Sequence, residues 1–104
     1  MTKVLILGAN GQLARNTTRV FLRDTDAKLT LYLRRANRLS NPDPARVTIV
    51  EGDVLAVPTL TAAMQGQDVV YANLAGAMKE QADRIVQAMH ATGTKRLIFI
   101  SSDL

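Results

Sequence analysis

The 104-residue sequence has no cysteine, no tryptophan, one histidine, two tyrosines and two phenylalanines. Without cysteine the chain forms no disulfide or thiolate metal site, and a lone His90 does not make a metal site either. So few aromatic rings offer little for stacking on single-stranded bases. No apolar run approaches the roughly 20 residues of a membrane helix, and Met1 leads almost directly into a strand-like run without a signal peptide. We therefore expect a cytoplasmic protein that binds neither metal nor membrane.

Acidic residues are also few: nine against 13 basic ones, for a formal net charge of +4. Such an excess suits either nucleic acid or a phosphorylated small molecule. The basic residues cluster at Arg34, Arg35 and Arg38 and do not form a stripe. This clustering predicts a local anion site and no nucleic-acid binding.

Apolar runs typical of strands alternate with segments of helical spacing along the whole chain. Lys3–Leu7, for example, is a continuous apolar run that ends at a glycine, as a strand buried on both faces does. The expected strands are Lys3–Leu7, Lys28–Leu33, Arg46–Val50, Asp68–Asn73 and Arg96–Ser101, and the expected helices are Gln12–Arg23, Pro58–Gln65 and a long one from about Met78 that stops at Gly93. The polar loop 37–44 is expected to hold a short helix or none.

This alternation implies right-handed crossovers and a parallel sheet covered on both faces. We predict an α/β fold, a Rossmann-like doubly wound sheet of about five strands in the order 3-2-1-4-5, in one domain over residues 1–104. The core-facing residues are expected to be Leu13, Thr17, Val20 and Phe21 in the first helix, and Met78, Ala82, Ile85, Val86 and Met89 in the last.

The segment from Gly8 to Ala14 has the spacing G-x-x-G-x-x-A and lies where the first strand passes into the first helix. A helix N-terminus presents free N–H groups and a positive dipole end, which bind phosphate. Gly8 would permit a tight turn, Gly11 a close approach of the backbone to a pyrophosphate, and Ala14 close helix–strand packing. The cofactor contacts expected from this loop are Gly8, Asn10, Gly11, Gln12 and Leu13. The alternative is an ordinary glycine turn.

The residues after the second strand indicate which dinucleotide is bound. An NAD site places a carboxylate about 20 residues past the glycine loop, on the ribose 2′-hydroxyl. No acidic residue lies between Asp26 and Asp43, and Arg34 and Arg35 stand there instead. A guanidinium matches a 2′-phosphate, so the sequence predicts NADP, with Arg34 as the closer contact. The alternative is two solvated surface arginines.

The loop Gly8–Ala14 resembles that of the extended and atypical short-chain dehydrogenase/reductases, in particular the NmrA-like NAD(P)-binding proteins. Three later segments continue this resemblance, which covers the whole chain: Gly52-Asp53-Val54 is similar to the family's adenine-contacting segment, Asn73-Leu74-Ala75-Gly76 to the segment beside the nicotinamide ribose, and Lys95–Ser102 to the strand that ends in its active-site serine or threonine. Asp53 would alternatively be a helix cap or turn residue, and Asn73 a strand-end residue that satisfies backbone groups.

The family's Tyr-x-x-x-Lys pair has no counterpart in these 104 residues. Tyr32 and Tyr71 lack a lysine four positions on and are expected to be core or sheet residues, and His90 to be structural. The resemblance leaves Ser102 as the candidate for orienting a carbonyl; the alternative is a polar strand end.

We expect an incomplete Rossmann domain; the alternative is a natural short chain that self-associates through its open edge strand. The resemblance implies the NADP(H)-binding domain of a reductase-like protein for a small carbonyl-type substrate. The alternative function is a non-catalytic, NADP-sensing regulator of NmrA-like type.

Overall fold

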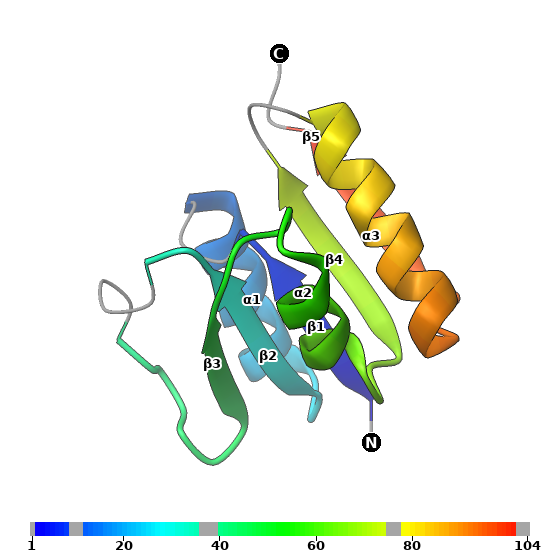
Figure 1. Ribbon diagram of the computed structural model, residues 1–104. Coiled ribbons are helices and arrows are strands. Elements are labelled where there is room, and N and C mark those ends of the chain that lie inside the picture. The colour runs from blue at the N-terminus through cyan, green and yellow to red at the C-terminus, as the bar shows by residue number, and fades with distance from the viewer. Residues whose placement is uncertain (1, 9–11, 36–39, 75–77, 102–104) are drawn as a thin grey trace.

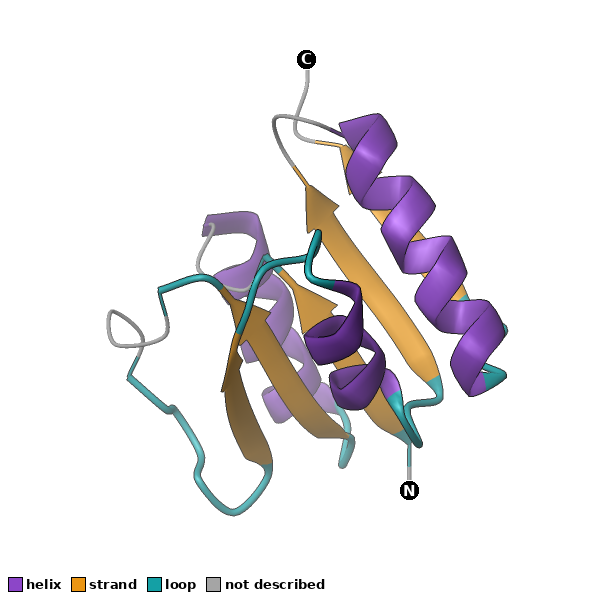
Figure 2. Ribbon diagram, viewed as in Figure 1, coloured by secondary structure: helices purple, strands orange, loops and turns teal. Residues whose placement is uncertain are grey.

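The computed structural model describes residues 2–8, 12–35, 40–74 and 78–101, which form one parallel sheet between two layers of helices (Figure 1 and Figure 2). The strands are β1 (Lys3–Leu7), β2 (Lys28–Leu33), β3 (Val47–Glu51), β4 (Val69–Leu74) and β5 (Leu97–Ser101), and the helices are α1 (Gln12–Asp24), α2 (Val57–Met64) and α3 (Met78–Thr92). All neighbouring strands pair in parallel, in the order β3-β2-β1-β4-β5. The predicted fold class and strand order are confirmed.

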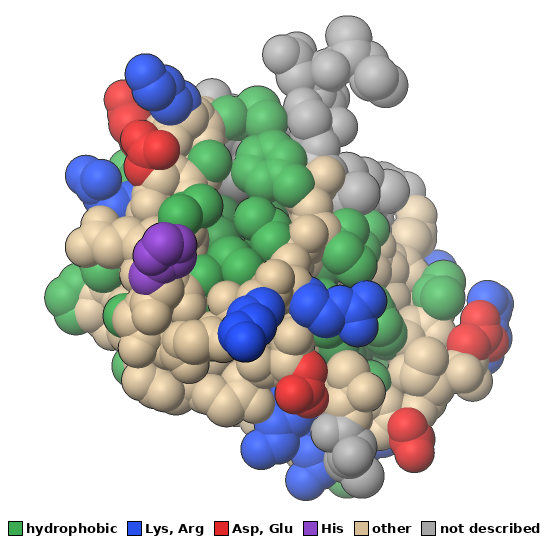
Figure 3. All heavy atoms as spheres, turned by 90° about the vertical axis from the view of Figure 1, so that its right-hand side faces the viewer, with side chains coloured by type: hydrophobic (Ala, Val, Ile, Leu, Met, Phe, Trp, Pro, Cys, Tyr) green, Lys and Arg blue, Asp and Glu red, His purple; other side chains and the backbone are tan. Residues whose placement is uncertain are grey.

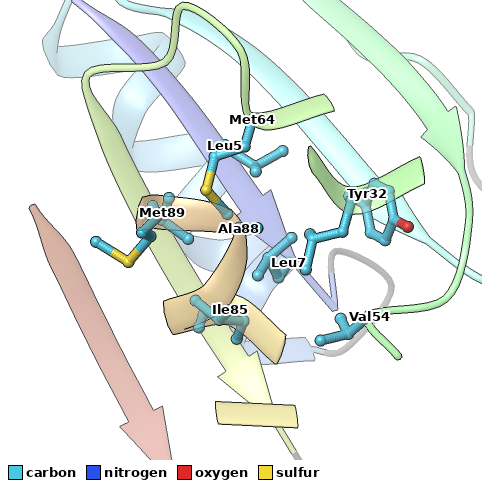
Figure 4. Close-up of a cluster of buried hydrophobic side chains, with 11 residues drawn as sticks. Leu5, Leu7, Tyr32, Val54, Met64, Ile85, Ala88 and Met89 are labelled. Carbon is cyan, nitrogen blue, oxygen red and sulfur yellow. The ribbon is translucent and has the colours of Figure 1, made fainter. Parts of the chain in front are cut away.

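The sheet is buried on both faces because apolar residues of its central strands point to both sides. In β1, Val4 and Ile6 face α1, while Leu5 and Leu7 face α2 and α3. All four side chains are fully buried. Figure 4 shows the larger cluster, in which Leu5 and Leu7 lie beside Met64 of α2 and residues of α3.

The predicted core faces of α1 and α3 are wrong at one residue each. Val20 is 47% exposed and Val86 is 46% exposed. Among the described side chains, α1 buries Ala14 and Thr18, while α3 buries Ile85 and Met89, as predicted, together with Ala88. In both helices the buried face is set by i, i+3 and i+4 neighbours, and one further residue around the helix turns a side chain about 100° away from the sheet. Thr18 is tolerated in the core because its hydroxyl donates to the Ala14 carbonyl at 2.8 Å.

Arg46 fastens the carboxyl end of α1 to the sheet, which the sequence did not indicate. Its guanidinium donates hydrogen bonds to the carbonyls of Leu22 at 2.9 Å, Thr25 at 2.6 Å and Ala27 at 3.0 Å. The last carbonyls of a helix have no partner within the helix, and a cation there also meets the negative dipole end. Arg46 lies just before β3, so one side chain joins α1, β2 and β3.

The connection from β2 to β3 forms no helix within residues 34–35 and 40–46. Its later part is a turn in which the Arg46 and Val47 N–H groups donate to the Asp43 carbonyl at 2.9 and 2.8 Å. The Asn41 side-chain amide donates to the Val47 carbonyl at 2.8 Å. A side chain therefore helps to hold this turn, which forms no helix in its described part.

The β5 edge of the molecule exposes apolar side chains. Ile98 is 41% exposed and Phe99 is 39% exposed, on opposite faces of β5 because successive strand residues alternate. Figure 3 shows hydrophobic side chains on the side of the molecule that carries α3 and β5. Within the described ranges, β5 pairs only with β4. No helix in the described part of the chain has the length and apolarity needed to cross a membrane.

Candidate functional site

The carboxyl ends of β1, β2, β3 and β4 meet at one edge of the sheet, where backbone hydrogen bonds hold them together. The Gly8 N–H donates to the Tyr32 carbonyl at 3.0 Å, and the Gly52 N–H donates to the Leu33 carbonyl at 2.9 Å. The strand order reverses between β1 and β4. In doubly wound sheets, the crevice at such a reversal is where ligands bind.

Gly8 begins the turn after β1 and has a left-handed backbone with φ of +71°. A Cβ atom at this position would overlap the carbonyl oxygen of Asn73 at the end of β4. Glycine is therefore required twice, by its dihedral angle and by the close approach of β4. Of the other predicted loop contacts, Asn10 and Gly11 lie outside the described residues.

Helix α1 begins at Gln12, so Gln12 and Leu13 form its first turn, although their side chains are outside the described part. No carboxylate occupies this first turn. Ala14 is fully buried among the residues that α1 packs against the sheet. Its small side chain lets the helix approach the strands closely, as the sequence predicted.

Asn73 carries buried polar atoms without partners at the reversal point. Its side-chain Oδ1 and Nδ2 are both buried, and neither has a hydrogen-bond partner in the structure as described. An unmade hydrogen bond of a buried amide costs about 1–3 kcal/mol, so such a group calls for a reason. An amide can both accept and donate, which suits a ligand with hydroxyl groups. Leu74 ends β4 with its side chain outside the described part, and Ala75 lies outside the described residues.

The segment Gly52-Asp53-Val54 forms the turn between β3 and α2. Asp53 accepts the Leu55 N–H on its side-chain Oδ1 at 2.9 Å, and its backbone carbonyl accepts the Ala56 N–H at 3.0 Å. Asp53 is therefore a turn residue in the structure, and its adenine contact stays a prediction. The Val54 side chain is buried in the larger core cluster.

Tyr32 connects β2 to this turn and was predicted only as a core or sheet residue. Its phenol is buried and donates to the Asp53 carbonyl at 2.8 Å. Burial, and secondarily the negative charge of Asp53, raise the pKa of the Tyr32 phenol. A Cβ on Gly52 would overlap the Tyr32 ring and hydroxyl, so glycine is needed here for space. No local sequence pattern links two residues 20 positions apart, and this contact was missed.

Tyr71 lies on the opposite face of the sheet. Its ring meets Phe21 edge to face, with centroids 6.4 Å apart, and its hydroxyl lies 3.3 Å from the Thr17 hydroxyl that donates to it. Both tyrosines are therefore sheet residues with partners, as expected.

Arg34 and Arg35 follow β2 directly and are both exposed. Their neighbour in the sheet is the end of β3, where Glu51 pairs in register with Leu33. The sequence has no acidic residue directly after β2. It did not predict that Glu51, the acidic residue that ends β3, lies beside Leu33 at the same edge of the sheet. Arg38 and Ser102 lie outside the described residues. His90 is exposed in the last turn of α3.

A fully parallel sheet in this order, a glycine pressed against β4 and an unpartnered amide at the strand reversal define a dinucleotide-binding Rossmann-type domain. Residues 8–103 match the model of the NAD(P)H-binding family, and the chain belongs to that family. It is an NAD(P)-binding domain of the kind found in reductase-like and dehydrogenase-like proteins.

Solved structures agree with this assignment. A Rossmann-fold NAD(P)-binding family protein from Shigella flexneri is 46% identical, with a TM-score of 0.86, over 95% of this chain and 51% of its own. A short-chain dehydrogenase/reductase from Veillonella parvula, solved in complex with NADP, is 31% identical, with a TM-score of 0.87, over 98% of this chain and 48% of its own.

A third structure, uronate dehydrogenase from Agrobacterium tumefaciens complexed with NAD, is 23% identical with a TM-score of 0.74, over 98% of this chain and 41% of its own, and shares the fold. The chain spans about half the length of the first two relatives. No curated protein matches the chain.

Proposed function

We propose that the chain binds NADP(H), as the cofactor-binding part of a reductase-like protein that acts on a small carbonyl-type substrate. The observation that carries this proposal is the pair Arg34 and Arg35, exposed immediately after β2 where an NAD site would have its carboxylate. A relative of 31% identity has been solved with NADP, which supports the same choice.

Each residue of the site contributes a different interaction in this proposal. The backbone at Gly8, free of a side chain, lets the pyrophosphate approach the start of α1. The Arg34 guanidinium, assisted by Arg35, pairs with the 2′-phosphate. The Asn73 amide completes its hydrogen bonds on ribose hydroxyls. When bound, the reduced cofactor would supply a hydride. Ser102 remains the predicted group for orienting the carbonyl.

Calorimetric titration of NADPH and NADH tests the cofactor preference. Replacing both arginines (Arg34→Ala and Arg35→Ala) removes the phosphate partners and should weaken NADPH at least about tenfold, because one charge-assisted hydrogen bond contributes about 1.5–3 kcal/mol. NADH binding should change little. The matched control is Lys95→Ala with Arg96→Ala, which removes two exposed positive charges at the amino end of β5. Equal weakening of NADPH and NADH would contradict the proposal, as would the same loss in the control.

As the alternative to an incomplete domain, we propose that copies of the chain associate through β5. The support is the apolar pair Ile98 and Phe99, exposed on both faces of a strand that pairs with one neighbour in the described structure. Sedimentation velocity should show a concentration-dependent oligomer that Ile98→Lys disrupts. Val20→Lys, at an equally exposed apolar residue of α1, should leave the oligomer intact. A monomer at every concentration would refute the association.

A further inference from the structure

We propose that Tyr32 is a positioning residue for the adenine side of the cofactor site, acting through the backbone of Asp53. This inference rests on the function proposed above and on the predicted role of the turn Gly52–Val54, which by resemblance would border the adenine. Tyr32 itself would touch no part of the cofactor. Its phenol would set where the turn lies relative to the phosphate-binding turn at Gly8.

One residue holds both turns. The backbone carbonyl of Tyr32 accepts the Gly8 N–H at 3.0 Å, and its phenol donates to the Asp53 carbonyl at 2.8 Å. The ring is fully buried against the glycine at position 52. Figure 4 shows the Tyr32 side chain at the rim of the core cluster beside Leu7, with its hydroxyl oxygen at the outer end. A rigid aromatic ring thus fixes the spacing between the two turns.

The turn that Tyr32 holds has little other support from side chains of α2. Helix α2 starts after Ala56, which forms no side-chain capping bond. The Asp53 carbonyl therefore has two described donors, the Ala56 N–H and the Tyr32 hydroxyl. The Asp53 carboxylate is used locally, because its Oδ1 accepts the Leu55 N–H. Of these bonds, only the one from Tyr32 reaches the turn from another strand.

If Tyr32 only filled space in the hydrophobic core, its hydroxyl group would not be needed. Phenylalanine would fill the same space beside Leu7 but would leave the Asp53 carbonyl with one donor. Tyr71 provides a matched comparison within the chain: its hydroxyl is engaged by Thr17 at 3.3 Å, on the other face of the sheet. Removing either hydroxyl costs one side-chain hydrogen bond, yet only the hydroxyl of Tyr32 contacts the proposed adenine turn.

The test compares Tyr32→Phe with Tyr71→Phe in calorimetric titrations of 2′,5′-ADP and NADPH, with urea unfolding of each variant measured in parallel. Loss of one buried hydrogen bond should weaken 2′,5′-ADP and NADPH alike, by about threefold to tenfold in Tyr32→Phe. Tyr71→Phe should bind both as the unaltered chain does. Equal losses of affinity in the two variants would show that the effect comes from a general loss of stability, and would overturn the inference.

Nuclear magnetic resonance of the unaltered chain gives a second readout that needs no variant. Addition of 2′,5′-ADP should shift the backbone amide signals of Leu55 and Ala56, which bond to Asp53. If these signals do not move while 2′,5′-ADP binds, the inference is wrong. If 2′,5′-ADP and NADPH both bind but Tyr32→Phe binds them normally, the positioning role fails and the proposed function stands. If the unaltered chain binds neither ligand, the proposed function itself fails, and the inference with it.

Discussion

The carbonyl oxygen of Asn73 occupies the space that a Cβ atom at Gly8 would need. The two residues lie at the carboxyl ends of neighbouring strands, β1 and β4, at the point where the strand order reverses. The chain can therefore turn out of β1 only through a residue without a side chain. The same contact brings the start of the proposed phosphate-binding turn next to the Asn73 amide, which has no described partner.

Gly8→Ala should destabilise the fold more than Gly93→Ala does. Both glycines are left-handed, with φ of +71° and +74°, but nothing lies within 4 Å of a Cβ at Gly93. The backbone strain alone costs about 1–2 kcal/mol in each variant. Overlap with the Asn73 carbonyl should add about 1–3 kcal/mol in Gly8→Ala. Urea unfolding measures the stability of both variants. Equal losses in the free energy of unfolding would show that β4 moves away from the added Cβ atom without an energetic cost.

Asn73→Leu should separate stability from binding. Leucine removes a buried amide that lacks described partners, so the free energy of unfolding without cofactor should stay equal or rise. NADPH binding should weaken, because the proposed ribose contacts are lost. Thermal unfolding with and without NADPH measures both effects in one experiment. A clear loss of stability without cofactor would mean that the amide serves the fold.

Arg46→Ala should lower the free energy of unfolding by about 2 kcal/mol or more, since hydrogen bonds from a charged group contribute about 1.5–3 kcal/mol. The carbonyl of Leu22 in the last turn of α1, and those of Thr25 and Ala27 in the connection to β2, lose these hydrogen bonds. Arg46→Lys should recover only part of this, because one ammonium does not reproduce the planar fork. The control is Arg19→Ala, on the exposed surface of α1, which should change stability by less than about 0.5 kcal/mol. A similar loss in the control would contradict the capping role.

Ionisation of Tyr32 should destabilise the chain at alkaline pH. The folded state raises the pKa of this phenol above its ordinary value of about 10, chiefly through burial. The neutral phenol is therefore favoured by folding, so its contribution is intact below about pH 10 and is lost as pH rises through the folded pKa. The stability difference between the unaltered chain and Tyr32→Phe should narrow above about pH 10, as measured by urea unfolding. A constant difference through that range would disprove the shift.

Prediction from the sequence succeeded where local pattern determines structure. Continuous apolar runs and their alternation with helical spacing were enough for five strands in the observed order, with ends correct to within one residue, as at Val47–Glu51. The glycine turn at Gly8 was also found, because its position between strand and helix carries the signal. Val20 and Val86 were placed wrongly because hydrophobicity alone does not tell which edge of a helix stripe meets the sheet.

The contacts that organise the candidate site were less accessible from the sequence. The bond from Tyr32 to Asp53, the Gly52 contact and the Arg46 cap all join residues about 20 or more positions apart. Such pairs depend on strand register, which is known only once β2 and β3 are aligned. The unpaired state of the Asn73 amide is likewise a property of its three-dimensional surroundings.

At the ends of β2 and β3, the Gly52 N–H donates a backbone hydrogen bond to the carbonyl of Leu33, and Arg34 is the residue that follows Leu33. Residues 34 and 35 are exposed and lie outside the core clusters, so exchanging their side chains should leave folding almost untouched. If the proposed preference for the 2′-phosphate is correct, the protein can change it by surface substitutions alone. Cofactor choice would then evolve independently of stability, and engineering could alter it at these two positions without compensating mutations.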